Sequence, residues 1–281
     1  YNYVKGLEDR EEKTVPIEDI GMLVLEHQQI TLSHYLLDKL VANNTAVITC
    51  NETHHPSGML LPLESHTIQS ERFRAQIEAS EPLKKQLWQQ TVKAKINNQA
   101  AVFKKWGLGS RLLTNLAADV KSGDAGNHEA IAAAHYWQNL LPSAWQFFRK
   151  RDGPPPNNLL NYGYAILRAT MARAIAGAGL LPTLGIFHRN RYNAYCLADD
   201  IMEPYRPFVD VIVRSIIDQT SVVDVLTQEL KVQLLKLPTV DVLLGEETSP
   251  LMVATQRTAT SLARCYLGEQ RKLLYPEMEI G

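Results

Sequence analysis

The sequence predicts an α+β protein, with a small β-rich N-terminal domain (residues 1–65) followed by a larger all-α C-terminal domain (residues 66–281). Three observations support this prediction. A chain of 281 residues is long enough to form two modest cores. Its first 64 or so residues contain short β-branched and apolar runs. From about residue 66 onward, apolar side chains recur three and four positions apart, as on helices.

In the N-terminal domain, VPIEDIGMLVLEH (15–27) and TAVITCN (45–51) are predicted strands. PSGMLLPLE (56–64) is expected to follow a turn at Pro56–Gly58. Between the first two strands, SHYLLDKLVANN has helical spacing, with Ser33 as its cap and an end at Asn43–Asn44.

The C-terminal domain is expected to be a set of helices joined by loops. Helical spacing occurs in residues 66–80, 82–106, 128–141, 158–179 and 249–270. RKRDGPPPNN (149–158) is a predicted loop, because three consecutive prolines cannot lie inside a helix.

Composition limits the class of protein. Hydrophobic residues make up 45% and charged residues 21%, as in ordinary globular proteins. Three widely spaced cysteines, an odd number without a CxxC pair, predict a reducing cytoplasm and no zinc ribbon. The longest apolar run, 171–187, is interrupted by Arg173 and Pro182, so no membrane span is expected.

Charge is unevenly divided along the chain. Residues 1–80 hold 6 Lys and Arg against 12 Asp and Glu, whereas residues 81–111 hold seven basic residues against Glu81 alone. Such a basic segment can bind DNA phosphates. Its irregular spacing means that not all of its lysines share one face, and a solvated helix face is the alternative. The lysines chosen as candidate DNA contacts are Lys93, Lys95, Lys104 and Lys105.

Several familiar motifs are excluded. HEAIAAAH (128–135) lacks a second histidine four residues after the first, since position 132 is alanine, so it is not a zinc-protease motif. GAGLLP (177–182) lacks the third glycine of a dinucleotide-binding loop and is better interpreted as a helix end.

Acidic residues and one histidine form a more informative pattern. Asp200 and Glu203 are three apart, so on a helix both project from one side, and Pro204 is expected to kink the chain just after them. His188 precedes them by 12 and 15 residues. Asp199, four residues before Glu203, could replace Asp200.

Glu129 begins another predicted helix, with Asn127 or Asp124 as its cap. One imidazole and two or three carboxylates from different elements suit an open site for Mg²⁺ or Mn²⁺. The same residues could equally be structural or solvated, and spacing alone does not decide between these interpretations.

Four blocks in order resemble a known family. They are THHPSGMLLPLESHTIQSERFRAQIEASEPLKKQLWQQTVKAKINNQA, HEAIAAAHYW, PPPNNLLNYGYAILRATMARAIAGAGL and LGIFHRNRYNAYCLADDIMEPYRPFVD. Together they resemble the CRISPR-associated endonuclease/integrase of spacer acquisition, the larger subunit of the adaptation complex. The resemblance is to its type II branch, and the length of the first block indicates subtype II-C.

The resemblance implies a metal centre in which Glu129, His188 and Glu203 are both catalytic residues and ligands of Mg²⁺ or Mn²⁺. Asp200 matches a second acidic position of the family and is an additional candidate ligand. The resemblance also implies a homodimer, with two dimers flanking a dimer of the small second adaptation subunit in a heterohexamer. The family normally has further strands ahead of Tyr1, and the stretch LPTVDVLLGEETSP (237–250) differs from the simpler turn expected there.

The implied reaction inserts new spacers into the CRISPR array, when a 3′-hydroxyl attacks the phosphates at the repeat borders. Its DNA partners are the double-stranded protospacer and the CRISPR repeat. Arg189, Arg191 and Arg206 are candidates for phosphate contacts near the break, or for pairing with Asp199 or Asp210. The rival functions are a non-catalytic DNA-binding scaffold and a stand-alone nuclease for branched DNA, which would use water where the integrase uses a DNA end.

Overall fold

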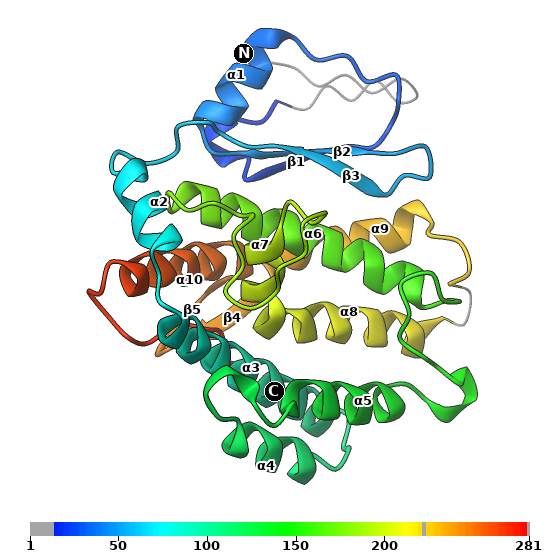
Figure 1. Cartoon of the computed structure of the whole chain (residues 1–281). Helices are drawn as coiled ribbons and strands as arrows, with labels where there is room; N and C mark the ends of the chain where they lie inside the picture. Colours follow the sequence, from blue (N-terminus) through cyan, green and yellow to red (C-terminus); the bar gives the residue numbers. More distant parts are fainter. Residues whose placement is uncertain (1–13, 221–222, 280–281) are drawn as a thin grey trace.

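The computed structural model describes residues 14–220 and 223–279 and confirms the predicted fold class, a small β region followed by a helical part (Figure 1). The elements, in chain order, are β1 (Met22–Leu25), α1 (His34–Ala42), β2 (Ala46–Cys50), β3 (Pro56–Leu60), α2 (Gln69–Ile77), α3 (Glu81–Lys105), α4 (Arg111–Asp119), α5 (His128–Leu140), α6 (Asn157–Gly177), α7 (Cys196–Ile201), α8 (Arg206–Gln219), α9 (Gln228–Leu235), β4 (Asp241–Leu244), β5 (Glu247–Pro250) and α10 (Leu251–Tyr266).

The sheet of the β region lies between α1 and α6 (Figure 1). β2 is its central strand, parallel to β1 and antiparallel to β3. Because successive side chains of a strand point to opposite faces, Val47 packs with Leu36 and Leu40 of α1, whereas Ile48 joins the core of the helical part. The sheet therefore rests on the helices that carry the candidate site.

Two expectations for the β region have different outcomes. Ser33 caps α1 as predicted, because its hydroxyl accepts a hydrogen bond from the Leu36 N–H at 3.1 Å. The turn predicted at Pro56–Gly58 is wrong, because that segment is strand β3. The chain turns earlier, where the Asn51 side chain accepts hydrogen bonds from the backbone N–H groups of Thr53 and His55.

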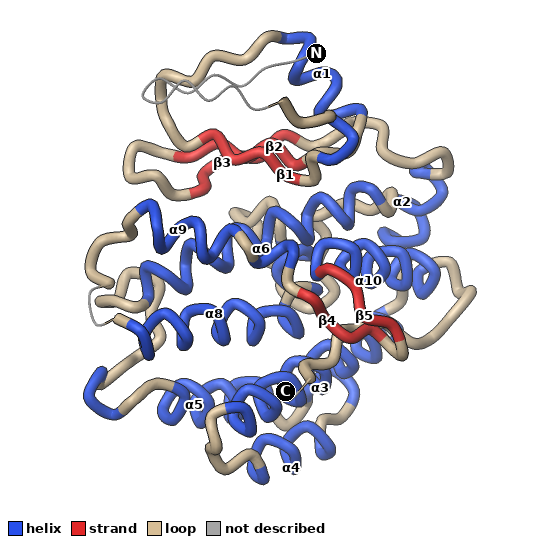
Figure 2. The backbone as a smooth tube through the Cα atoms, turned by 180° about the vertical axis from the view of Figure 1, so that it is seen from behind, coloured by secondary structure: helices blue, strands red, loops and turns tan. Residues whose placement is uncertain are grey.

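Helix α6 is the centre of the helical part. Most of its side chains are buried, and α7, α8, α9 and α10 pack around it. The long helix α3 lies against α4, α5 and α8, so it connects the α4–α5 pair with the helices that pack around α6 (Figures 1 and 2). Within the described residues, no helix combines the length and the apolar character that crossing a membrane requires.

The C-terminal part is not entirely helical, which corrects the all-α prediction in one place. Residues 241–250 form the antiparallel hairpin β4–β5, which lies beside α10 (Figure 2). The reason lies in VDVLL (240–244), whose alternation buries Val242 and Leu244, and in Gly245, which turns the chain with φ +70°. This is the stretch in which the sequence differed from the expected simple turn.

The predicted domain boundary at residues 65–66 lies in the connection between β3 and α2. The division into two domains stays a prediction. The strands expected ahead of Tyr1 lie outside the described residues.

A buried polar network ties three helices together beneath the candidate site. Asp210 of α8 accepts hydrogen bonds from the hydroxyls of Tyr164 in α6, at 2.5 Å, and Tyr136 in α5, at 3.0 Å. Burial raises the pKa of Asp210 to about 6, although the two hydroxyls partly oppose this shift. The carboxyl group of Asp210 therefore ionises at a higher pH in the folded chain than in the unfolded one.

Replacing Asp210 should change how stability depends on pH. The folded-state pKa is raised, so the stability contributed by this group is complete below about pH 4 and is lost as pH rises through about 6. Relative to Asp210→Asn, the wild type should lose roughly 3 kcal/mol of unfolding free energy between pH 4 and 7. Urea unfolding across this range measures the difference, with Asp218→Asn on the same helix as the control. Parallel profiles for wild type and Asp210→Asn would contradict the prediction.

Candidate metal centre

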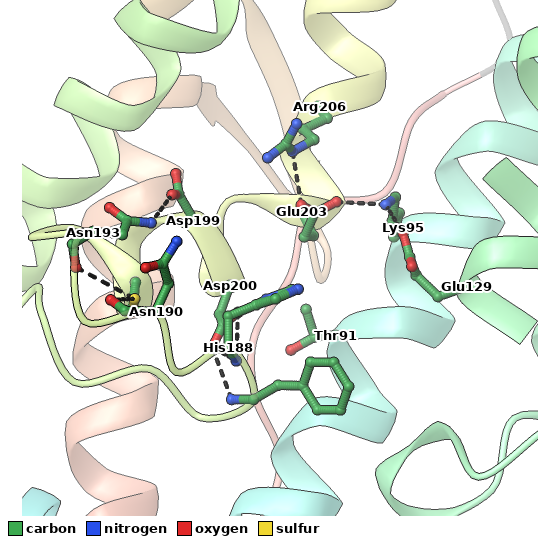
Figure 3. A network of polar contacts seen from close by, with 12 residues as sticks. Thr91, Lys95, Glu129, His188, Asn190, Asn193, Asp199, Asp200, Glu203 and Arg206 are labelled. Atoms are coloured by element: carbon green, nitrogen blue, oxygen red, sulfur yellow. Dashed lines mark hydrogen bonds and ion pairs between the residues drawn. The ribbon is translucent and has the colours of Figure 1, made fainter. Parts of the chain in front are cut away.

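The predicted site residues come from three separate elements that meet beside α3 (Figure 3). Glu129 lies in the first turn of α5, His188 lies in the loop before α7, and Glu203 lies in a 3-10 turn, Glu203–Tyr205, between α7 and α8.

Asp124 fixes the start of the helix that carries Glu129. Its carboxylate accepts hydrogen bonds from the backbone N–H groups of His128, at 2.9 Å, and Glu129, at 3.0 Å. Asn127 has φ +53°, and its side chain makes no capping hydrogen bond within the described structure. Of the two predicted caps, Asp124 is therefore the one that satisfies the free N–H groups of the first turn.

Glu203 is held where the helix breaks. Helix α7 ends at Ile201 and α8 begins at Arg206, so the interruption expected from Pro204 is confirmed. The buried amide of Asn98 in α3 donates hydrogen bonds to the carbonyl of Pro204, at 2.8 Å, and to that of Pro276, at 2.9 Å. The C-terminal segment and α3 therefore fix the turn that presents Glu203.

Asp200 orients His188. Its carboxylate lies 2.5 Å from Nδ1 of His188 and also accepts a hydrogen bond from the Phe187 N–H at 2.8 Å. The close approach requires Gly185, because a Cβ there would lie 2.8 Å from Asp200 Oδ2 and 2.5 Å from the His188 carbonyl. The hydrogen bond to Asp200 is the main reason why the pKa of His188 is raised.

This arrangement assigns different roles to the imidazole and the carboxylate. Asp200 is fully buried, whereas the His188 side chain is 55% exposed and packs edge-on against Trp88. With Nδ1 bonded to Asp200, Nε2 is the nitrogen left for a ligand, as in the carboxylate–histidine pairs of metal sites. We therefore assign Asp200 to the orientation of His188, which differs from the expectation that it assists as a ligand.

Lys95 lies between the two glutamates. Its ammonium contacts Oε1 of Glu129 and lies 2.5 Å from Oε2 of Glu203, and its side chain is only 9% exposed (Figure 3). Burial lowers the pKa of Lys95, but the two carboxylates outweigh this effect and raise it. Lys95 is therefore not part of an exposed basic stripe, and its prediction as a DNA contact is wrong.

Glu203 has a second cation beside it. Nε of Arg206 lies 2.8 Å from Oε1 of Glu203, and the guanidinium stacks over the ring of Tyr164 at 4.7 Å. Burial opposes ionisation of Glu203, but Arg206 and then Lys95 outweigh it and lower the pKa of this carboxyl. Arg206 thus forms its close ion pair with Glu203, whereas Asp199 and Asp210 act on it only through weaker attraction that helps to raise its pKa.

As they stand, no three His, Cys, Asp or Glu side chains of residues 14–220 and 223–279 gather closely enough to hold one metal ion. The chemistry of the set nevertheless fits a divalent cation. Glu129 and Glu203 already contact one cation, the Lys95 ammonium, and two oxygens around one nitrogen can be at most about 6 Å apart. Glu129, His188 and Glu203 are the residues that would hold the ion.

The remaining predicted DNA contacts lie at the surface. Lys93 is half-buried, and Lys104 and Lys105 are exposed. Arg189 pairs with Glu81 at 2.5 Å, and Arg191 stacks over the exposed ring of Tyr192 at 4.7 Å. These side chains are accessible, but they do not form one continuous stripe with Lys95.

Sequence reasoning missed the place of Lys95, although a signal was present. Lys95 follows Thr91 and Val92 by four and three residues and precedes Gln99 by four, and all of these residues are buried on one face of α3. A lysine on the buried face of a helix indicates a paired charge. The count of charges along residues 81–111 does not show on which face of the helix each lysine lies, so it did not reveal that Lys95 is buried.

The fold and the site together define a class: an α+β protein whose helical part pairs two carboxylates with one buried lysine and holds an oriented histidine in the same polar network (Figure 3). Residues 3–236 match the family model of the CRISPR associated protein Cas1. The chain is also 41% identical over 228 residues to the CRISPR-associated endonuclease Cas1 of Neisseria meningitidis serogroup C (strain 8013), which covers 80% of this chain and 74% of the relative. The chain belongs to the Cas1 family.

Solved structures share the fold. A casposase bound to an integration product superposes with a TM-score of 0.81 at 22% identity, over 99% of this chain and 88% of that one. A chain of a Cas6-RT-Cas1–Cas2 complex superposes with a TM-score of 0.68 at 21% identity, over 92% of this chain and 32% of that one. At these identities the likeness concerns the fold alone.

Substitution of Asp200 tests its orienting role. Asp200→Ala leaves the Phe187 N–H without its acceptor and frees the imidazole, so the unfolding free energy should fall by about 1–3 kcal/mol. Affinity for Mn²⁺, measured by calorimetric titration, should fall about 10- to 100-fold. Asp199→Ala, which removes the neighbouring pair with Arg168, is the control and should leave Mn²⁺ affinity near that of the wild type. Unchanged affinity in Asp200→Ala would refute the assignment.

Proposed function

We propose that this protein is a divalent-metal-dependent DNA endonuclease/integrase of CRISPR adaptation. It would insert new spacers into the CRISPR array by attack of a 3′-hydroxyl on the phosphates at the repeat borders. Membership of the Cas1 family supports the endonuclease and integrase activity. The proposal includes the type II branch, subtype II-C and a cytoplasmic location. Three cysteines that are free in the described structure are in keeping with this location.

One observation carries the metal-dependent mechanism. Glu129 and Glu203, which are 74 positions apart in the sequence, contact the same buried cation, beside a histidine whose ring is oriented by Asp200. Removing several charges from water is costly, so a chain without use for such a cluster would gain by replacing it with apolar residues. A bound Mg²⁺ or Mn²⁺ would neutralise charge on the target phosphate and supply several kcal/mol of transition-state stabilisation.

The residues of the chain have the remaining tasks. Phosphoryl transfer needs in-line positioning and charge neutralisation, and no covalent enzyme group is required. With Nδ1 bonded to Asp200, His188 would hold the ion through Nε2 as a neutral ligand, and a nitrogen used in this way is not available as a general base. Arg206 is fixed between Glu203 and Tyr164, where it neutralises the charge of Glu203 inside the centre. This role differs from the exposed DNA contact that was predicted for Arg206.

Double-stranded DNA, both protospacer and repeat, is the proposed substrate. Lys93, Lys104, Lys105, Arg189 and Arg191 are the proposed phosphate contacts, since all have accessible side chains. The proposed assembly is a homodimer that joins a small second adaptation subunit in a heterohexamer. Two structural relatives support these partners, because one is bound to an integration product and another belongs to a complex with Cas2.

Strand transfer of a short duplex into a repeat-bearing plasmid, with and without the small subunit, tests the function. Glu129→Ala, His188→Ala and Glu203→Ala should each reduce joined products to background while DNA binding largely persists, because backbone charge contacts dominate affinity. Glu247→Ala, an exposed glutamate of the β4–β5 hairpin, is the control and should behave as the wild type.

Each product pattern corresponds to one function. Products joined at the repeat borders identify an integrase. Nicks without joining identify the rival nuclease for branched DNA. DNA binding without cleavage or joining identifies the rival scaffold, and in the last two cases the proposal would be wrong.

A further inference from the structure

The position between Glu129 and Glu203 is already a cation site that this chain fills itself. Lys95 reaches it from α3, and the two glutamates reach it from α5 and from the turn before α8. The Lys95 side chain is 9% exposed, that of Glu203 10% and that of Glu129 30%. The Lys95 ammonium is therefore enclosed by the two carboxylates and largely shielded from water.

Charge explains why the position is filled. Two carboxylates this close repel each other, and the repulsion is strong where water is largely excluded. Arg206 compensates one oxygen of Glu203, but the Glu129 carboxylate has no partner other than Lys95 within the described residues. Without a cation between them, the two glutamates would be expected to move apart.

A divalent ion and the ammonium cannot share this position. An ion bound to both glutamates places its donors roughly 2.0–2.4 Å away, which is within the space that the ammonium now takes. A single and a double positive charge held a few Å apart in a buried site would also repel each other strongly. The four-carbon stem of lysine, however, allows its ammonium to swing away without movement of the helix.

We propose that Lys95 is an internal cation that holds Glu129 and Glu203 together until a divalent ion displaces it, and that it thereby sets the metal affinity of the centre. This inference rests on the metal-dependent part of the proposed function. Lys95 is thus a positioning residue, which keeps the carboxylates in place in the metal-free protein and competes with the ion when one is present.

Lys95→Met tests this role, since methionine keeps a long flexible side chain and removes the charge. Lys93→Met, two residues away on the same helix and outside the cluster, is the matched control, and Lys95→Arg keeps the charge. Mn²⁺ affinity is measured by calorimetric titration, and thermal unfolding is followed in EDTA and in saturating Mn²⁺.

Lys95→Met should bind Mn²⁺ about tenfold more tightly than the wild type or still more tightly, because the competing charge is gone. In EDTA it should melt several degrees lower than the wild type, since two buried carboxylates lose their cation. Saturating Mn²⁺ should remove most of that deficit. Lys93→Met should match the wild type in both measurements, and Lys95→Arg should not gain affinity.

Other outcomes overturn the inference in distinguishable ways. If the wild type binds Mn²⁺ and Lys95→Met binds it equally or more weakly, Lys95 does not compete with the ion, while the proposed function stands. If Lys95→Met is as stable as the wild type in EDTA, Lys95 does not hold the carboxylates. If neither protein binds Mn²⁺, the metal centre itself is wrong. Should Lys95→Met fail to fold even with Mn²⁺, Lys95→Gln is judged by the same criteria.

Discussion

A buried carboxylate that stays ionised needs compensating charge beside it, and the arrangement of the helical part follows from that need at Glu203. Lys95 from α3 and Arg206 from α8 pair with its two oxygens, so three elements must meet within a few Å. Asn98 fixes the turn from the α3 side, and Asp210 ties α8 to α5 and α6 below it. Removing one partner from such a cluster leaves an uncompensated charge, which is why these contacts depend on one another.

Different residues orient the imidazole of His188 and compensate the charge of the carboxylates. Asp200 and Gly185 fix the ring of His188 through a hydrogen bond and a close backbone approach. Lys95 and Arg206 balance the carboxylates. The described part of the β region contributes no side chain to these contacts, and it covers the side of α6 that faces away from α3 (Figure 1). A centre built on packed helices in this way is held more firmly than one built on loops alone.

Periodicity in the sequence predicted the main strands and helices, because each of them buries one face. The pattern of buried and exposed side chains can be recognised within a single segment. It did not predict the β4–β5 hairpin, whose strands are short and pair with each other, apart from a single bridge between Leu243 and Glu277. The sequence and the family resemblance chose Glu129, His188 and Glu203, but they misplaced Lys95 and gave Asp200 a ligand's role. Which charge faces which depends on how distant helices pack, and the spacing within one segment does not contain that information.

We propose Glu129, His188 and Glu203 as one divalent-metal centre from which Lys95 is displaced. Anomalous diffraction at the manganese edge, from crystals of the protein soaked in Mn²⁺, locates both the ion and the ammonium. We expect a peak roughly 2.0–2.4 Å from both glutamates and from Nε2 of His188, with the Lys95 ammonium moved out of the space between the carboxylates. A peak coordinated by Asp200, or Lys95 still between the glutamates with no peak beside them, would contradict it.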